Sequence, residues 1–239
     1  MNQQMRKNRG MVFGALIGGL LIFLIPAVGH AQEPLFQQEP LQQEEERIVP
    51  LEKVAVLPFL IVKPQEPEQR VVKGLWGEFF FRSGEVPMRA GSEVTTLFYR
   101  QLNRLGRCEL LPLARTRAAA EGVDREAFRQ DPRGVAQQFG EKLGLYAVVI
   151  GGVYRFEQRE GSALGVQRPA SAAFDAHLIR VSDKKVLWSG RFDETQHSLS
   201  ENLLKVGSFL RGGAQWVTVE RWTEIGIESV LRTFPTLAR

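Results

Sequence analysis

The chain has 239 residues, 44% hydrophobic and 24% charged, which fits a globular protein and excludes collagenous, coiled-coil and wholly disordered classes. Most of its net charge of +4 comes from residues 1–31, which hold Arg6, Lys7 and Arg9 and no acid. Without these three bases, 28 basic and 27 acidic residues remain, so the basic face that nucleic-acid binding requires is not expected. The single cysteine, Cys108, excludes an intramolecular disulfide and is expected to be a small buried residue.

Residues 1–31 have the layout of a secretory signal peptide. A basic start is followed by the uncharged apolar run Met11–Val28 and by two small residues, Gly29 and Ala31. Pro26 ends the apolar helix and leaves the following residues extended, as cleavage requires. We therefore expect export to the periplasm and removal of residues 1–31. An uncleaved anchor is the alternative, since the apolar run is at the short limit for a membrane span.

Residues 32–50 are rich in Gln, Glu and Pro. Such a segment cannot bury enough apolar surface to offset the entropy of ordering it. The sequence therefore predicts a disordered acidic tether at 32–50, followed by one folded domain at 51–239. No cysteine stands directly after the apolar run, so an anchor through an N-terminal lipid-modified cysteine is not expected.

The first elements of the domain follow from hydrophobic patterning. The nearly continuous apolar run Lys53–Val62 predicts a strand buried on both faces, whose pairing Pro58 interrupts. Residues 63–91, rich in Pro and Gly, are expected to form a long irregular excursion. A helix is expected from an N-cap at Ser92 to Gly106.

The remaining elements complete the predicted order β-α-β-α-β-β-β-α-α. We expect a helix that Asp131 and Pro132 open and Gly144 ends. Strands at 172–181 and 186–193 are expected to form a hairpin. The other predicted elements are a short strand at 108–111, one or two helical turns within 113–128, a strand at 146–157, and helices at about 199–210 and 219–231.

Three segments in this pattern stand out together. They are Lys53–Phe59 (KVAVLPF), Leu143–Val153 (LGLYAVVIGGV), and the hairpin pair Arg180–Asp183 and Val186–Gly190. In this order they resemble the CsgG-like, LpoB-like and TolB-amino-terminal-like periplasmic domains, over about residues 53–195. The resemblance implies a three-layer α/β domain with a mixed β-sheet flanked by helices, a location in the cell envelope and a non-enzymatic role.

The chain departs from the pattern of that family at three places. Tyr146 stands where an Asp is usual, and Lys184 where a turn Gly is common. A CsgG pore also needs long amphipathic hairpins, and the connection at 160–170 is too short for one. The resemblance therefore does not extend to pore formation, and it identifies no partner.

No motif of a known catalytic or phosphate-binding class is present in the sequence. The best acid–base candidates are Asp175, His177, Asp193 and His197. Asp175 and His177 lie two apart on one predicted strand, so their side chains share a face. We interpret that face as the polar, solvent-exposed side of the hairpin. The alternatives are a metal site or a small hydrolase; the prediction is no enzyme, no cofactor and no metal.

An aromatic stretch within the predicted excursion is the candidate partner-binding site. It comprises Trp76, Phe79, Phe80 and Phe81. Clustered aromatic side chains dominate interface energetics, which favours a docking surface. The alternative is that the excursion folds back and covers an open face of the sheet, because each buried ring stabilises by about 1.5–3 kcal/mol.

These observations together predict an exported, non-enzymatic adaptor or assembly component that binds another envelope protein of unknown identity. Peripheral contact with the outer membrane and homo-oligomerisation are left open, and nucleic acid is not expected as a partner. The alternatives are a subunit of an outer-membrane-associated export oligomer and a small hydrolase or metal-binding enzyme.

Overall fold

A computed structural model of the chain describes residues 52–66, 68–75, 77–161, 166–196 and 216–238. The chain divides into residues 1–46 and 47–239, and every described residue belongs to the second unit. The expected signal peptide, tether and helix at 199–210 lie outside the described residues. Within the described ranges, no helix is both long and apolar enough to cross a bilayer.

The described elements keep the predicted order and add several short strands and a helix. In chain order they are β1 (Lys53–Val56), β2 (Leu60–Ile61), β3 (Val71–Lys73), β4 (Phe80–Arg82), α1 (Ala90–Leu105), β5 (Glu109–Leu110), α2 (Leu113–Ala120), α3 (Arg125–Gln130), α4 (Pro132–Leu143), β6 (Ala147–Glu157), β7 (Glu160–Gly161), β8 (Val166–Arg168), β9 (Ser171–Arg180), β10 (Val186–Thr195) and α6 (Val219–Leu231).

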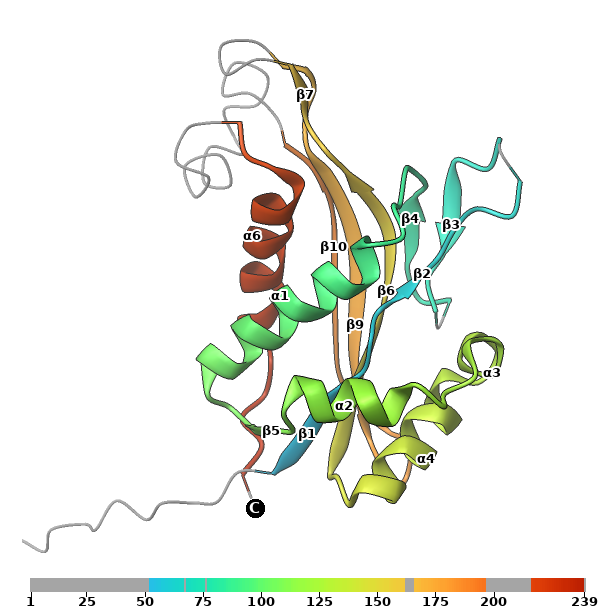
Figure 1. Cartoon of the computed structure of the whole chain (residues 1–239), viewed down its shortest axis with the longest axis vertical. Coiled ribbons are helices and arrows are strands. Elements are labelled where there is room, and N and C mark those ends of the chain that lie inside the picture. Colours follow the sequence, from blue (N-terminus) through green and yellow to red (C-terminus); the bar gives the residue numbers. More distant parts are fainter. Residues whose placement is uncertain (1–51, 67, 76, 162–165, 197–215, 239) are drawn as a thin grey trace, which may run out of the picture. The chain divides into compact units, whose positions relative to one another are not determined.

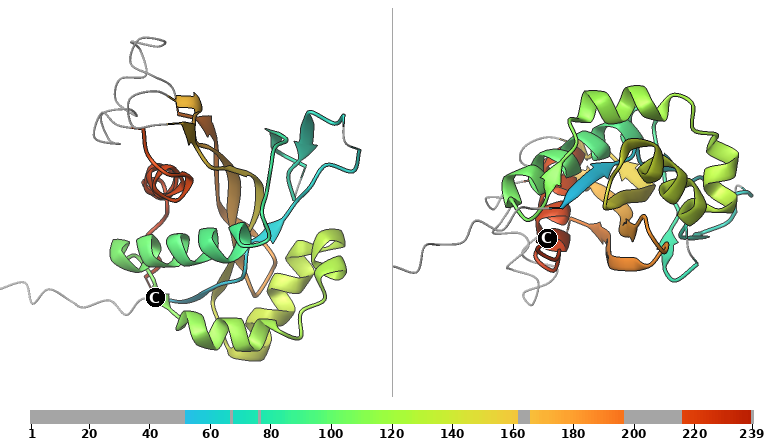
Figure 2. Two further views of the ribbon diagram at one scale, coloured as in Figure 1. Left: turned by 45° about the horizontal axis from the view of Figure 1, so that its top comes forward. Right: turned by 90° about the horizontal axis from the view of Figure 1, so that it is seen from below.

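The fold is built around a six-stranded mixed sheet. Its order is β10-β9-β6-β1-β5, and β2 pairs with a further part of β6. β1 runs parallel to β5 and β6, whereas β6, β9 and β10 are antiparallel neighbours. Helices α1 and α6 cover one face, and α2 to α4 lie on the other (Figures 1 and 2). The predicted three-layer α/β domain with a mixed sheet is confirmed.

The first strand is interrupted at Pro58, as the sequence predicts. The β1 register with β6 ends at Val56, and β2 resumes pairing with β6 at Leu60. Between them, the N–H of Phe59 donates to Thr95 Oγ1 of α1 at 2.9 Å. The side chain of Thr95 thus replaces the ladder partner that the break removes, and it ties α1 to the sheet.

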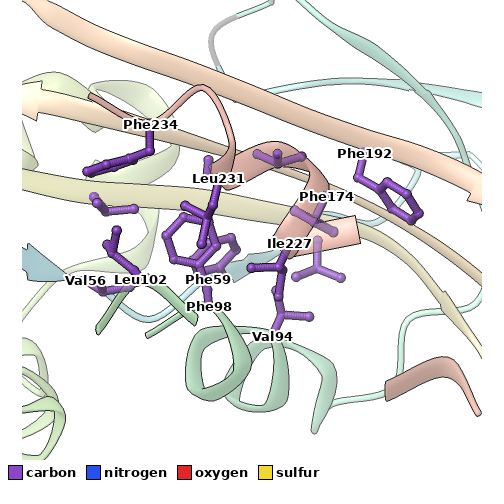
Figure 3. Close-up of a cluster of buried hydrophobic side chains, with 14 of the residues drawn as sticks. Val56, Phe59, Val94, Phe98, Leu102, Phe174, Phe192, Ile227, Leu231 and Phe234 are labelled. Atoms are coloured by element: carbon purple, nitrogen blue, oxygen red, sulfur yellow. The ribbon is translucent and has the colours of Figure 1, made fainter. Parts of the chain in front are cut away.

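The larger core lies between the sheet and helices α1 and α6. Val94, Phe98 and Leu102 recur every four residues along α1, so they form one apolar stripe, and all three are fully buried. They pack in one cluster with Ile227 and Leu231 of α6 (Figure 3). Burial of each such side chain stabilises the fold by about 1.5–3 kcal/mol, so this cluster fixes both helices on the sheet.

A smaller core fills part of the opposite face. Phe139 of α4 packs against Val148 and Ile150 of β6 and Ile179 of β9. This cluster covers only one end of that face. Elsewhere on this face, Tyr154 of β6 and Ala173 of β9 pack with Val72 and Phe81 of the segment between β2 and α1.

The helix ends can be compared with the capping residues that the sequence predicts. α1 begins at Ala90, after Arg89, so the predicted N-cap at Ser92 is wrong. The Ser92 hydroxyl lies in the first turn and donates to the Arg89 carbonyl, a bond that competes with capping. The left-handed Gly106 at the end of α1, with φ of 66°, is confirmed, as is the Asp131 cap of α4.

The turn between β9 and β10 confirms the predicted hairpin. Lys184 has φ of 58° and is the one non-glycine residue with positive φ in the described ranges. This is the position at which the resembled family commonly has Gly, so the backbone there keeps the conformation that Gly favours. The Arg180 guanidinium binds both carboxylate oxygens of Asp183 and lowers the pKa of that carboxyl to about 2.

The single thiol is a core group. Cys108 is 7% exposed and packs in the cluster with α1 and α6. Burial raises the pKa of the Cys108 thiol to about 12, so it stays protonated at neutral pH. The expectation of a small buried residue is confirmed.

Candidate functional site

The centre of the predicted excursion is a β-hairpin. Strands β3 and β4 pair antiparallel, with Val71 opposite Arg82, Val72 opposite Phe81 and Lys73 opposite Phe80. The expectation of irregular structure over 63–91 is therefore wrong at its centre. Strands of three residues, flanked by Gly and Pro, are too short to show the alternation that identifies a strand in a sequence.

The inner face of the hairpin packs two aromatic rings onto the sheet. The Phe81 ring stacks on that of Tyr154 of β6, with centroids 3.9 Å apart and an interplanar angle of 5°. Phe79 lies over His177 of β9 at 6.0 Å. The Arg191 guanidinium of β10 lies 5.5 and 5.4 Å from the Phe79 and Phe81 ring centres, a cation–π arrangement.

Below these rings is a buried chain of polar side chains. The Tyr154 hydroxyl donates to Asp175 Oδ2 at 2.8 Å, and the Gly152 N–H donates to Asp175 Oδ1 at 2.9 Å. His177 Nε2 lies 3.3 Å from Asp175 Oδ2, while His177 Nδ1 is hydrogen-bonded to Ser189 Oγ at 2.8 Å. Burial, and then the Asp175 carboxyl, raise the pKa of the Tyr154 phenol and keep it protonated.

Two glycines allow the close packing around Asp175. A Cβ on Gly152 would lie 2.6 Å from the Tyr154 hydroxyl, and one on Gly74 of the hairpin 3.0 Å from Asp175 Oδ2. The missing side chain at 152 makes room for the phenol. The missing side chain at 74 lets the hairpin backbone approach the carboxyl.

A second polar group lies beside the first and centres on Arg155 of β6. Its guanidinium donates to Ser171 Oγ at 2.5 Å, to the Arg82 carbonyl at 2.9 Å and to Asp193 Oδ1 at 2.7 Å. Asp193 Oδ2 accepts from the Arg82 N–H at 3.2 Å. The side chains of Arg155 and Asp193 are 6% and 12% exposed, so this is a buried ion pair whose hydrogen bonds are satisfied.

Side chains of the sheet thus hold the backbone of the hairpin. The Leu75 N–H donates to the Tyr154 hydroxyl at 3.0 Å. Asp193 and Arg155 bind the N–H and the carbonyl of Arg82, and Arg191 donates to the Phe80 carbonyl at 3.5 Å. With the two buried rings, these bonds fix the orientation of the hairpin on the sheet.

The outer face of the hairpin is exposed. It consists of Val71, Lys73, Phe80 and Arg82, and we call it the hairpin face. Phe80 is 58% and Val71 47% exposed, and with Met88 they are the large hydrophobic side chains exposed in the described part of the chain. Because two large hydrophobic side chains are exposed together on one fixed element, the hairpin face is the candidate binding surface.

Buried Asp175 and His177 and half-buried Ser189 contain the groups of a hydrolytic triad, but their setting does not support catalysis. His177 and Asp175 are both fully buried, and Phe79 covers the imidazole ring. A general base must reach the proton of a substrate or nucleophile at a place that the substrate can enter. Among the described residues, no three His, Cys, Asp or Glu side chains are placed to hold a metal ion.

No protein-family model matches the chain, and no curated protein matches its sequence. Solved structures do resemble it. The PelC dodecamer structure from Paraburkholderia phytofirmans shares 16% identity at a TM-score of 0.43, over 79% of this chain and 89% of that one. Lipoprotein GNA1162 from Neisseria meningitidis shares 16% identity at 0.41, over 67% and 92%. The LpoB C-terminal domain from Escherichia coli shares 13% at 0.37, over 63% and 87%.

The aromatic stretch proposed from the sequence is divided between two environments. Phe81 is 1% exposed and belongs to the interior, so its assignment to an exposed docking surface is wrong. Phe79 is half-buried over His177, Phe80 is exposed, and Trp76 lies outside the described residues. The hairpin thus covers the sheet with one face and presents Phe80 on the other.

The acid–base candidates are also placed differently from the prediction. Asp175 and His177 are not on a solvent-exposed face, because the hairpin covers them. Asp193 binds Arg155, and His197 lies outside the described residues. Sequence reasoning missed Arg155. Its place in the sequence could have indicated a buried ion pair, because a charged residue inside a long apolar run such as β6 is rare unless its charge is paired.

Proposed function

We propose that the protein is exported to the periplasm and acts there as a non-enzymatic adaptor or assembly component, which binds another envelope protein through the hairpin face. The signal-like residues 1–31 support export. The enclosed setting of the polar side chains favours a structural role for them over a catalytic one. The hairpin face then remains as the surface that interacts with a partner.

One observation carries this proposal: an exposed phenylalanine on an element that side chains of the sheet hold in place. Phe80 is exposed, although Phe79 and Phe81 on either side of it contact the sheet. Binding through a fixed surface avoids the entropy cost of ordering a loop, so a fixed hairpin favours affinity. Aromatic side chains, phenylalanine among them, are enriched at protein interfaces.

Export is tested by fusing residues 1–31 to a reporter enzyme that is active only outside the cytoplasm. We expect activity from the fusion and loss of it when Leu20 and Leu21 are replaced by Arg, because charges in the apolar run block its insertion. A fusion that is stable but inactive, and is found in the cytoplasm, would contradict the proposed location.

Partner binding is tested with a photo-crosslinking residue at position 80 or 71 in living cells. We expect both positions to capture one and the same exported protein, identified by mass spectrometry. A crosslinker at Glu121, an exposed position at the end of α2, is the matched control and should not capture it. Equal capture from all three positions, or none from 80 and 71, would exclude the hairpin face as the binding surface.

A further inference from the structure

The two cations of the hairpin face have no anionic partner in the described part of the chain. Neither the Lys73 ammonium nor the Arg82 guanidinium makes an ion pair or side-chain hydrogen bond there, although both side chains are exposed. Some surface cations outside this face are paired, as Arg89 is with Glu93 and Arg221 with Glu224. The free charges thus lie on the same face as the exposed phenylalanine.

The arrangement of the four side chains is regular. Val71 is opposite Arg82, and Lys73 is opposite Phe80, so the two cations lie on one diagonal and the two hydrophobic side chains on the other. Neighbours across the strands are about 5 Å apart and neighbours along a strand about 7 Å. An extended chain places alternate side chains at this same spacing of about 7 Å.

We infer that the hairpin face binds a segment of a partner protein in which carboxylate side chains accompany aliphatic or aromatic ones. This rests on the proposed function and adds the chemistry of the partner. Carboxylates form charge-assisted hydrogen bonds with Lys73 and Arg82. Apolar side chains of the same segment cover Val71 and Phe80, and exclude water from those bonds.

A protein segment fits this surface better than an anionic bilayer does. Residues 32–239 carry 28 bases and 27 acids, so no excess of positive charge draws them to a negative membrane. Two bases strengthen binding to an anionic bilayer by only about thirtyfold together.

The charges are tested with paired variants of the full chain in the crosslinking assay from position 80. The double variant Lys73→Gln and Arg82→Gln should lower capture of the partner about tenfold or more, because the charge-assisted bonds are lost. Lys73→Arg with Arg82→Lys keeps the charges and should retain capture. Arg115→Gln with Lys142→Gln removes two exposed bases elsewhere and is the matched control. Equal melting temperatures show that all variants are folded.

The captured segment is then mapped by mass spectrometry, and a synthetic peptide of that segment is compared with its glutamine-substituted form and with phosphatidylglycerol vesicles. An acidic and apolar segment whose peptide binds, and loses binding on substitution, supports the inference. Capture that survives the Lys73→Gln and Arg82→Gln change, or a segment without acids, overturns it but leaves the adaptor function standing. Binding of the purified protein to vesicles alone overturns both.

Discussion

Replacing Arg155 with Met is expected to lower the free energy of unfolding by about 3 kcal/mol, because the largely buried Asp193 carboxylate loses its cation at 2.7 Å and keeps only the more distant Arg191 guanidinium, 3.9 Å away. The same change removes the donor to the Arg82 carbonyl, while the Ser171 hydroxyl keeps its hydrogen bond with Thr195 Oγ1. Chemical denaturation measures the loss. Hydrogen exchange measures where it acts: the Arg82 amide should lose protection before the amides at the centre of β6.

Two variants make this prediction specific. Arg168→Met breaks an ion pair with Glu160 whose side chains are 58% and 55% exposed, and it should cost less than about 1 kcal/mol. Arg155→Met combined with Asp193→Leu removes both buried charges and should be more stable than Arg155→Met alone. If Arg155→Met costs no more than Arg168→Met, the buried pair does not hold the hairpin on the sheet.

Phe81→Ala is expected to destabilise the protein by about 3–5 kcal/mol, whereas Phe80→Ala should change the free energy of unfolding by less than about 0.5 kcal/mol. The two residues are neighbours in the chain, but Phe81 is 1% exposed and stacks on Tyr154, and Phe80 is 58% exposed. Thermal and chemical denaturation of the two variants measure the difference. Similar losses would mean that both rings are buried in solution.

The same two variants separate stability from binding. Phe80→Ala should reduce capture of the partner by a crosslinker at position 71 while the melting temperature is unchanged. Phe81→Ala should reduce both, since the hairpin loses its packing against β6. A Phe80→Ala protein that captures its partner normally would remove the central residue from the proposed surface.

Much of the sheet could be predicted because its signals are local. The apolar run of β6, the alternation in β9 and β10, and the Thr218-capped helix α6 each show a period or a cap within a short window. Pro58 indicated the break between β1 and β2, because proline has no N–H to donate to the hydrogen-bond ladder of the sheet. These elements depend on few distant residues, so the sequence pattern is sufficient.

The candidate site could not be predicted in the same way, because it forms from distant parts of the chain. The hairpin meets side chains some seventy or more positions away, and nothing near Asp175 and His177 indicates that a hairpin covers them. Alternating polar residues normally indicate a solvent-exposed face. Here the polar face is buried because its groups bind one another and the backbone of the hairpin.

The polar contacts that hold the hairpin are made to its main chain, at the N–H of Leu75, the N–H and carbonyl of Arg82 and the carbonyl of Phe80. Such contacts do not depend on which side chain stands at these positions, except that proline at 75 or 82 would remove a donor. Outward-pointing residues can therefore diverge while the attachment stays intact. A protein built in this way can acquire a new binding specificity through changes on the outside of one hairpin, without reorganising its interior.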